Sequence, residues 1–145
     1  MSALSIQQVP WSSHREQLLA VRHEVFVVEQ QVPADKEADD LDPQAVHFLA
    51  TDSQGTPIGT ARVLSDGHIG RVAVRKDRRG QGIGRALTEA AIRDLKERQF
   101  ASAMLNAQLS VVKFYEKLGF ESHGEVFEEC GISHIAMQLP LGTDS

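Results

Sequence analysis

A glycine-rich, basic loop between two apolar segments is the feature that most constrains how this chain folds. The first segment, Val72-Ala73-Val74, is short and apolar, and the loop that follows reads Arg79-Gly80-Gln81-Gly82-Ile83-Gly84-Arg85. After the loop, an apolar stripe recurs at helical spacing and consists of Ile83, Leu87, Ala90, Ala91 and Leu95. The pattern predicts a buried strand that runs through the loop into an amphipathic helix.

Such a loop can bind an anion through its backbone. Glycines let the backbone approach a ligand closely, because no Cβ stands in the way. The first N–H groups of the following helix lack intrahelical partners and lie at the positive end of the helix dipole. We therefore predict a site for a phosphate or a pyrophosphate at this loop.

Two widespread phosphate-binding motifs do not match the loop. The P-loop requires Gly-Lys-Ser/Thr after four intervening residues, and this sequence is absent. The dinucleotide motif Gly-x-Gly-x-x-Gly fails because Arg85 stands where the third glycine is required. The pattern that does fit is Arg79-x-x-Gly82-x-Gly84. A nucleotide-binding protein of another kind remains an alternative interpretation.

The segments around the loop predict one domain with a mixed sheet. Strands are expected at residues 4–9, 46–51, 57–64, 68–74, 101–106, 120–127 and 132–139, and helices from residue 13, over 83–95 and over 111–118. Ser13, with Glu16 three residues later, predicts a capping box, and Ser110 predicts an N-cap. The order β-α-β-β-β-α-β-α-β-β predicts an α/β (α+β) fold, with a mixed, mostly antiparallel central sheet flanked by helices. We expect a single domain of residues 1–145, with its core at about 4–140.

The composition favours a globular cytoplasmic protein. Of the 145 residues, 41% are hydrophobic and 24% are charged, which is typical of folded chains. We expect no membrane span, because no run of about 18 apolar residues occurs. We also expect no signal peptide, because the first residues lack a basic start followed by an apolar stretch. Cys130 is the single cysteine, so no intrachain disulfide can form, which favours a reducing compartment.

Charged residues gather in two clusters of opposite sign. Acidic side chains dominate residues 35–42 and basic side chains dominate residues 71–85, in a chain whose net charge is −5. The simplest interpretation is that both clusters are solvated surface. The alternative is a basic site for an anion and an acidic approach for a cationic ligand. Nucleic acid is not expected as a partner, because the net charge is negative and aromatic residues make up only 6%.

The loop resembles a family motif, and other segments resemble the same family. Arg79-x-x-Gly82-x-Gly84 is similar to the pyrophosphate loop of the GNAT superfamily of N-acetyltransferases, which reads Gln/Arg-x-x-Gly-x-Gly/Ala. Residues 105–108 and 114–120 resemble the strand-helix-strand unit that follows it. Arg22-His23-Glu24-Val25-Phe26-Val27-Val28-Glu29-Gln30 and Gly124-Glu125-x-Phe127-x-Glu129-x-Gly131-Ile132-x-His134 resemble a narrower branch, the ElaA-like and YjcF-like proteins. The resemblance covers about residues 22–137.

The resemblance implies the GNAT fold and a reaction in which acetyl-CoA passes its acetyl group directly to a primary amine within a ternary complex. It implies that the pyrophosphate binds the backbone amides of Arg79, Gly80, Gln81, Gly82, Ile83, Gly84 and Arg85. It also implies that the backbone of Val72, Ala73 and Val74 pairs with the pantetheine arm like an added strand. A backbone N–H near Val74 would then face the thioester carbonyl. Asn106 is expected either to hydrogen-bond this arm or simply to end its strand.

The general acid follows from the resemblance, whereas the general base does not. Tyr115 matches the family's tyrosine in the helix after the pyrophosphate helix, which implies that it protonates the leaving thiolate; its alternative role is to pack that helix on the sheet. Many relatives carry a glutamate on the strand before the loop, where this chain has Gly70-Arg71. Glu29 and His134 are the candidate bases, and proton removal through water needs neither of them. A structural role is the alternative for His134.

The remaining expectations concern partners and rival functions. An acyl-cysteine intermediate on Cys130 is an alternative mechanism, against which an exposed turn thiol is favoured. Residues 35–42 and Glu29 favour a cationic acceptor, either a small amine or a lysine side chain. We expect no metal, because the histidines show no metal-ligand spacing with carboxylates or cysteine. We expect no membrane or nucleic acid as partners, and a homodimer as the assembly. The main rival function is a non-catalytic acyl-CoA-binding sensor or interaction module on the same fold.

Overall fold

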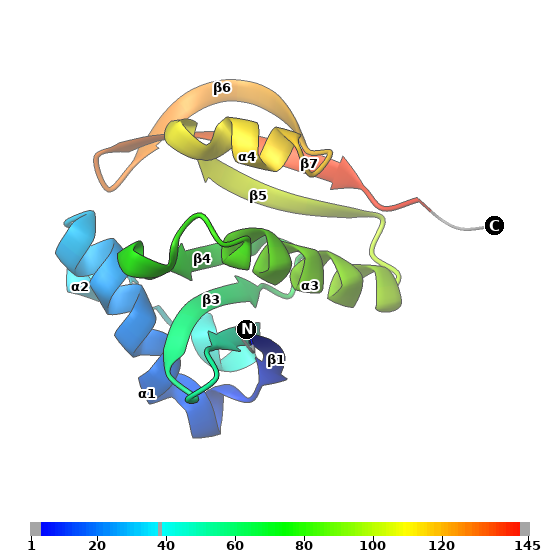
Figure 1. The fold of residues 1–145 in the computed structure, drawn as a ribbon. Coiled ribbons are helices and arrows are strands. Elements are labelled where there is room, and N and C mark those ends of the chain that lie inside the picture. The colour runs from blue at the N-terminus through cyan, green and yellow to red at the C-terminus, as the bar shows by residue number, and fades with distance from the viewer. Residues whose placement is uncertain (1–3, 38, 143–145) are drawn as a thin grey trace.

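The computed structural model describes residues 4–37 and 39–142, and the predicted domain of residues 1–145 extends beyond them at both ends. Its strands form two antiparallel sheets (Figure 1). The first has the order β1-β2-β3-β4 and consists of β1 (Ser5–Val9), β2 (Val46–Thr51), β3 (Pro57–Val63) and β4 (Ile69–Val74). The second has the order β5-β7-β6 and consists of β5 (Ser102–Gln108), β6 (Glu121–Glu129) and β7 (Ile132–Pro140). Each predicted strand is present, although several ends differ by a residue or two.

The helices lie between these strands in the predicted order. Helix α1 (Trp11–Arg22) continues directly into the π-helix η1 (His23–Glu29), and α2 (Ala34–Glu37), α3 (Ile83–Glu97) and α4 (Val112–Glu116) follow. Within the described residues, short 3-10 helices occur at η2 (Asp42–Gln44), η3 (Lys76–Arg78) and η4 (Leu109–Val111). The valine-rich run of residues 25–28 falls in η1, where the regular α-helical spacing is lost. None of the described helices is both long and apolar enough to cross a membrane.

Both predicted serine caps are wrong. Helix α1 begins at Trp11, because Pro10 before it has an extended backbone with φ −69° and ψ 141°. The His14 N–H then donates to the Pro10 carbonyl over 3.2 Å, so Ser13 lies within the first turn and not in front of it. Ser110 lies inside η4, and Val111 precedes α4 without a side-chain cap. A proline and a 3-10 turn therefore start these helices in place of the serines.

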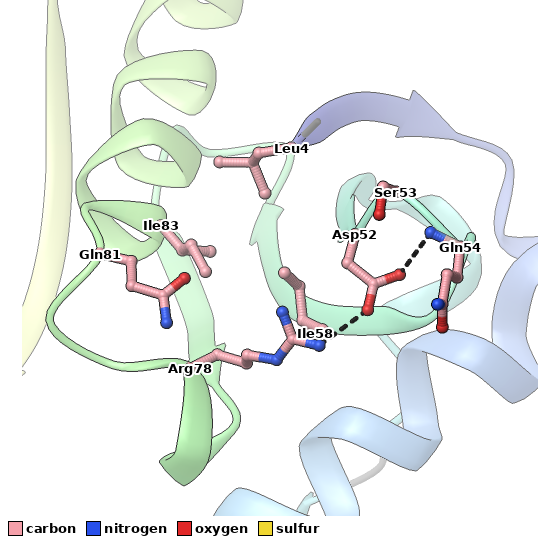
Figure 2. A pocket seen from close by; sticks show the side chains of 8 residues that line it. All are labelled: Leu4, Asp52, Ser53, Gln54, Ile58, Arg78, Gln81 and Ile83. Atoms are coloured by element: carbon pink, nitrogen blue, oxygen red, sulfur yellow. Dashed lines mark hydrogen bonds and ion pairs between the residues drawn. The ribbon is translucent and has the colours of Figure 1, made fainter. Parts of the chain in front are cut away.

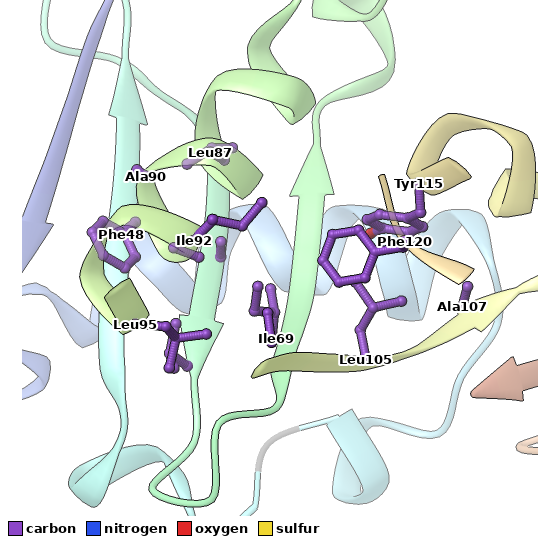
Figure 3. Close-up of a cluster of buried hydrophobic side chains, with 14 of the residues drawn as sticks. Phe48, Ile69, Leu87, Ala90, Ile92, Leu95, Leu105, Ala107, Tyr115 and Phe120 are labelled. Carbon is purple, nitrogen blue, oxygen red and sulfur yellow. The ribbon is translucent and has the colours of Figure 1, made fainter. Parts of the chain in front are cut away.

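The two faces of the first sheet pack against different helices. In β2, Phe48 and Ala50 belong to the main core with α3, whereas Leu49 between them packs with Leu18 of α1. This alternation is expected of a strand that is covered on both faces. The predicted stripe of α3 is buried in the main core and consists of Ile83, Leu87, Ala90, Ala91 and Leu95. Figure 3 labels three of these residues, Leu87, Ala90 and Leu95. Burying one leucine contributes about 1.5–3 kcal/mol, so the stripe fixes α3, and with it the preceding loop, on the sheet.

The acidic stretch of residues 35–42 is solvated only in part: Asp35 and Asp40 are exposed, whereas two other carboxylates are buried. Glu37 is 4% and Asp42 is 1% exposed. Arg22, itself fully buried, donates to both carboxylates, and its Nη1 lies 2.9 Å from Oδ1 of Asp42. Arg62 donates to the same oxygen over 2.8 Å and also to Asp39. Buried charges need such partners, so these carboxylates hold their own loop through the two arginines.

Candidate active site

The strand before the glycine-rich loop contains a β-bulge. The register of β3 with β4 shifts between Thr60 and Arg62, and Arg71 of β4 has a positive φ of 49°. The Thr60 hydroxyl donates to the Arg71 carbonyl over 2.9 Å, which secures the irregular backbone. A bulge bends its strand and increases the local twist. No local pattern other than the pair Gly70-Arg71 indicates this bulge.

Strands β4 and β5 run parallel but belong to different sheets. Within the described part of the chain, the pairing between them is a single bridge from His68 to Met104. A cavity of about 1320 Å³ extends along the two strands beyond this bridge. Its walls also include the glycine-rich loop, η1, α4 and the β6–β7 turn. The volume exceeds the roughly 300–1,000 Å³ of sites for drug-sized ligands, so it suits a long ligand.

This cavity brings together nearly all the site residues that the sequence predicts. They are Glu29, Val72, Ala73, Val74, Arg79, Gly80, Gly82, Ile83, Gly84, Arg85, Asn106, Tyr115 and His134. Gln81 is the exception. It lines a smaller cavity of about 200 Å³ beside Arg78 and Asp52 (Figure 2).

The loop has the backbone that its glycines predict. Gly80 and Gly82 have φ angles of 81° and 82°, a left-handed conformation that residues with a Cβ rarely adopt. Gly82 is the N-cap of α3, and the Ala86 N–H donates to the Gly82 carbonyl over 3.0 Å. The N–H groups that precede this first helical bond are those that a helix N-terminus leaves for a ligand. Several of these residues line the large cavity, so the N-terminus of α3 and the cavity are continuous.

The guanidinium of Arg79 joins the loop to η1. Its Nη1 and Nη2 donate to the two carboxylate oxygens of Glu29, each over 2.6 Å, and its Nε donates to the Val74 carbonyl over 2.9 Å. The hydrogen bonds from Arg79 lower the pKa of Glu29, although partial burial opposes the shift. Glu29 is therefore a stable anion in this arrangement. Neighbouring arginines form similar pairs, Arg75 with Glu24 and Arg78 with Asp52.

Tyr115 both packs and lines the cavity. Its ring makes edge-on contacts with Phe114 and Phe120, with centroids 5.0 Å and 5.9 Å apart, and it belongs to the main core (Figure 3). Burial raises the pKa of Tyr115 to about 12. The phenol is therefore protonated throughout the neutral range. The packing role considered from the sequence is therefore present, and the same side chain also lines the cavity in which proton donation is predicted.

His134 lies on β7, and its ring contacts two other residues. Its Nδ1 is 2.8 Å from the Ile132 carbonyl oxygen, and its ring stacks on Phe127 with centroids 5.8 Å apart. Cys130, in the turn before β7, is exposed. Among residues 4–37 and 39–142, no three His, Cys, Asp or Glu side chains form a group that could hold a metal ion.

Sequence reasoning missed a polar contact across the cavity. The Gln108 side chain donates from Nε2 to Oε1 of Gln30 over 2.9 Å, which connects the end of β5 to the end of η1. Both residues line the cavity. A signal existed, because Gln108 follows Asn106 by two positions and therefore lies on the same face of the strand.

Comparison with known proteins agrees with this geometry. The model of the acetyltransferase (GNAT) domain family matches residues 7–141. The uncharacterized N-acetyltransferase YjcF of Bacillus subtilis is 36% identical over 121 residues, which cover 81% of this chain and 86% of YjcF.

Solved structures of two relatives share the whole architecture. ElaA of Escherichia coli is 30% identical with a TM-score of 0.83, and an acyl-CoA N-acyltransferase of Pseudomonas aeruginosa is 31% identical with a TM-score of 0.84. Each similarity covers 94% of this chain and 99% of the other. The predicted fold, family and enzyme class are thereby confirmed. The chain belongs to the GNAT family of acetyltransferases.

Proposed function

We propose that this protein transfers the acetyl group of acetyl-CoA directly to a primary amine, with both substrates bound at once. The observation that carries the proposal is the continuity of the α3 N-terminus with the cavity between β4 and β5. An anion held at the loop would leave the rest of an elongated ligand lying along the two strands. The bound thioester supplies an activated acyl group, and the remaining roles fall to residues of this chain.

The loop and β4 are proposed to bind the acyl-CoA. The backbone amides from Arg79 to Arg85 would hold the pyrophosphate, because the left-handed glycines present them without obstruction by a Cβ. The backbone of Val72, Ala73 and Val74 would pair with the pantetheine arm, since the described part of β4 has a strand partner only on its β3 side beyond the His68 bridge. An N–H near Val74 would stabilise the carbonyl oxygen as it gains charge. Asn106 lines the opposite wall, on β5.

Tyr115 is proposed as the proton donor to the leaving thiolate. With a pKa of about 12, its phenol keeps its proton at neutral pH and can hydrogen-bond a sulfur that gains negative charge. An ordinary thiol has a pKa of about 8.5. Burial in the same cavity raises the pKa of a thiol as well, which narrows the difference between donor and acceptor.

Glu29 is proposed to position Arg79. Its lowered pKa and its two hydrogen bonds to Arg79 make it a poor proton acceptor at neutral pH. The pair instead ties η1 to the loop that is proposed to hold the pyrophosphate. Loss of the pair would therefore affect cofactor binding more than the chemical step.

The acceptor is proposed to be a small amine or a lysine side chain. It would reach the cavity from the η1 side, where Glu29 and Gln30 line the wall. We also propose the reducing cytoplasm as the compartment, because Cys130 has no second cysteine to pair with.

A homodimer is the proposed assembly. Size-exclusion chromatography with light scattering measures the mass of the purified protein and checks this directly.

Two measurements test the proposal. In the first, the melting temperature of the protein is recorded separately with CoA, with ATP and with NAD. Of the three, only CoA should raise the melting temperature, because a ligand that binds the native state stabilises it by mass action. In the second, thiol release from acetyl-CoA is followed across a panel of amines that includes Nα-protected lysine and 1,4-diaminobutane. Thiol release that depends on the amine supports acetyl transfer. Binding of CoA without any such release would leave a non-catalytic binder.

A further inference from the structure

His134 lies on the side of the second sheet that faces η1. It is paired with Gln108 in the register of β7 and β5, and directly paired residues carry their side chains on the same face. Gln108 in turn hydrogen-bonds Gln30 at the end of η1. The alternate residue Ala107 points the other way, into the main core that contains Tyr115. His134 and Tyr115 therefore reach the cavity from opposite faces of the sheet.

The hydrogen bond of His134 fixes which ring nitrogen carries the proton. A carbonyl oxygen accepts but cannot donate, so the 2.8 Å contact with the Ile132 carbonyl requires a hydrogen on Nδ1. In the neutral ring, Nε2 then keeps its lone pair. Among the described residues nothing hydrogen-bonds Nε2. The residue is 8% exposed and lines the cavity, so this lone pair is available to a ligand.

The Phe127 ring stacks on the imidazole ring of His134. Phe127 is the register partner of His134 in β6, and the two rings stack at an interplanar angle of 20°. The Ile132 carbonyl and the Phe127 ring together fix the position and rotation of the imidazole. The ring orientation is thus set by the protein itself.

Other titratable groups around this end of the cavity are less suited to accept a proton. Arg79 holds Glu29 as an anion of lowered pKa. Glu129, at the end of β6, and Cys130, in the turn after it, also line the cavity, and both are exposed. Further along the cavity, the Glu37 and Asp39 carboxylates are paired with arginines. Imidazole is the side chain that ordinarily changes its charge between pH 5 and 8.

We propose that Nε2 of His134 is the general base that takes the proton from the acceptor amine. The inference rests on the proposed acetyl transfer. The amine nitrogen forms a bond to the thioester carbon while its proton passes to Nε2, and the C–S bond breaks as the sulfur takes the Tyr115 proton. The products are the acetylated amine and CoA thiol. The imidazolium then returns its proton to the tyrosinate through solvent, which restores both groups.

Matched histidine variants test the base in the intact enzyme. His134→Gln should lower kcat/KM by about 100-fold or more, remove the acidic limb of its pH profile, and leave the dissociation constant for CoA unchanged. His123→Gln is the control, because His123 is an exposed histidine of β6 in the same hairpin. It should behave like the wild type. A His134→Gln enzyme with the wild-type rate and pH profile would overturn the inference while leaving acetyl transfer intact.

A second measurement needs neither a variant nor an acceptor. Long-range ¹H–¹⁵N spectra of the wild-type protein at pH 8, with His134 assigned, report which ring nitrogen carries hydrogen. The structure predicts hydrogen on Nδ1 and a bare Nε2. Hydrogen on Nε2 would overturn the inference even if His134→Gln failed to fold. If the wild type bound CoA but acetylated no amine, the proposed function would fail separately from this tautomer.

Discussion

Arg79 and Glu29 are fifty residues apart in the sequence, yet the structure joins them through two hydrogen bonds of 2.6 Å each. One residue begins the glycine-rich loop motif and the other ends η1. The pair thus joins the loop to η1, which also lines the cavity. Glu29 could therefore act either as the partner of Arg79 or as a catalytic base, and a substitution at this position distinguishes the two roles.

Glu29→Gln is expected to weaken CoA binding several-fold without abolishing catalysis. The side chains of Arg79 and Glu29 are 40% and 32% exposed, so solvent screening limits the loss of stability to below about 1 kcal/mol. Calorimetric titration with CoA and a kcat measurement at saturating acetyl-CoA check this. A collapse of kcat with unchanged CoA affinity would instead identify Glu29 as the base.

Gly82→Ala should weaken CoA binding more than its loss of stability explains. Alanine at φ 82° carries a strain of roughly 1–2 kcal/mol and places a Cβ where the ligand should approach. Gly124→Ala is the matched control, because Gly124 has φ 79°, lies in β6 and does not line the cavity. Denaturant unfolding should show similar losses for both variants. Equal CoA affinities in the two variants would contradict the proposed pyrophosphate site.

Tyr115→Phe should lower kcat by about 100-fold or more while CoA binds as before. The phenylalanine keeps the edge-on ring packing but has no proton to donate. Thiol release under saturating substrates and CoA titration measure the two effects. An unchanged kcat would remove Tyr115 from the reaction and leave it as a packing residue.

In Tyr115→Phe, the free energy of unfolding should no longer fall at alkaline pH through ionisation of the residue 115 side chain. An unfolded tyrosine ionises near pH 10, whereas burial raises the pKa of Tyr115 to about 12 in the folded chain. The folded state therefore binds more protons between these values, and the free energy of unfolding falls as the pH rises through them. Two pKa units correspond to about 2.7 kcal/mol, present in full below pH 10. Urea unfolding of both proteins from pH 9 upward should show the difference, and parallel curves would contradict it.

Asp42→Asn should destabilise the protein by about 3–5 kcal/mol, because it leaves buried Arg22 and Arg62 without their shared carboxylate. Burial alone raises the pKa of Asp42, but hydrogen bonds from the two arginines hold it below its usual value. This contribution is present above the unfolded pKa of about 3.9 and is lost as the pH falls through the folded value. Asp94→Asn, in a helical surface pair with Arg98, should cost less than about 1 kcal/mol. Urea titrations at pH 7 and below compare the two variants.

The strands, the loop and α3 were predictable because their signals are local. Alternating apolar residues mark the strands, and the stripe from Ile83 to Leu95 marks the helix over its whole length. The cap predictions at Ser13 and Ser110 failed because Pro10 and a 3-10 turn set the backbone before these serines. Where several residues could begin a helix, the tertiary packing selects one of them, and the local sequence pattern does not show which.

The parts of the site that were not predicted depend on contacts between distant segments. From the sequence, Glu37 and Asp42 are expected to be solvated acids. In the structure they are buried, because Arg22 and Arg62 from other segments donate hydrogen bonds to them. The bulge at Arg71 depends on the pairing of β4 with β3. The orientation of His134 likewise depends on Phe127 of another strand. Each of these is a property of the folded pairing, which residue spacing alone does not encode.

Amide hydrogen exchange across residues 79–85, with and without saturating CoA, tests the central claim most directly. The account predicts that CoA slows exchange in this segment, because the pyrophosphate accepts hydrogen bonds from its backbone N–H groups. Residues 98–100, at the C-terminal end of α3 away from the loop, should exchange at the same rate in both samples. Saturating CoA that left residues 79–85 unprotected would contradict the account.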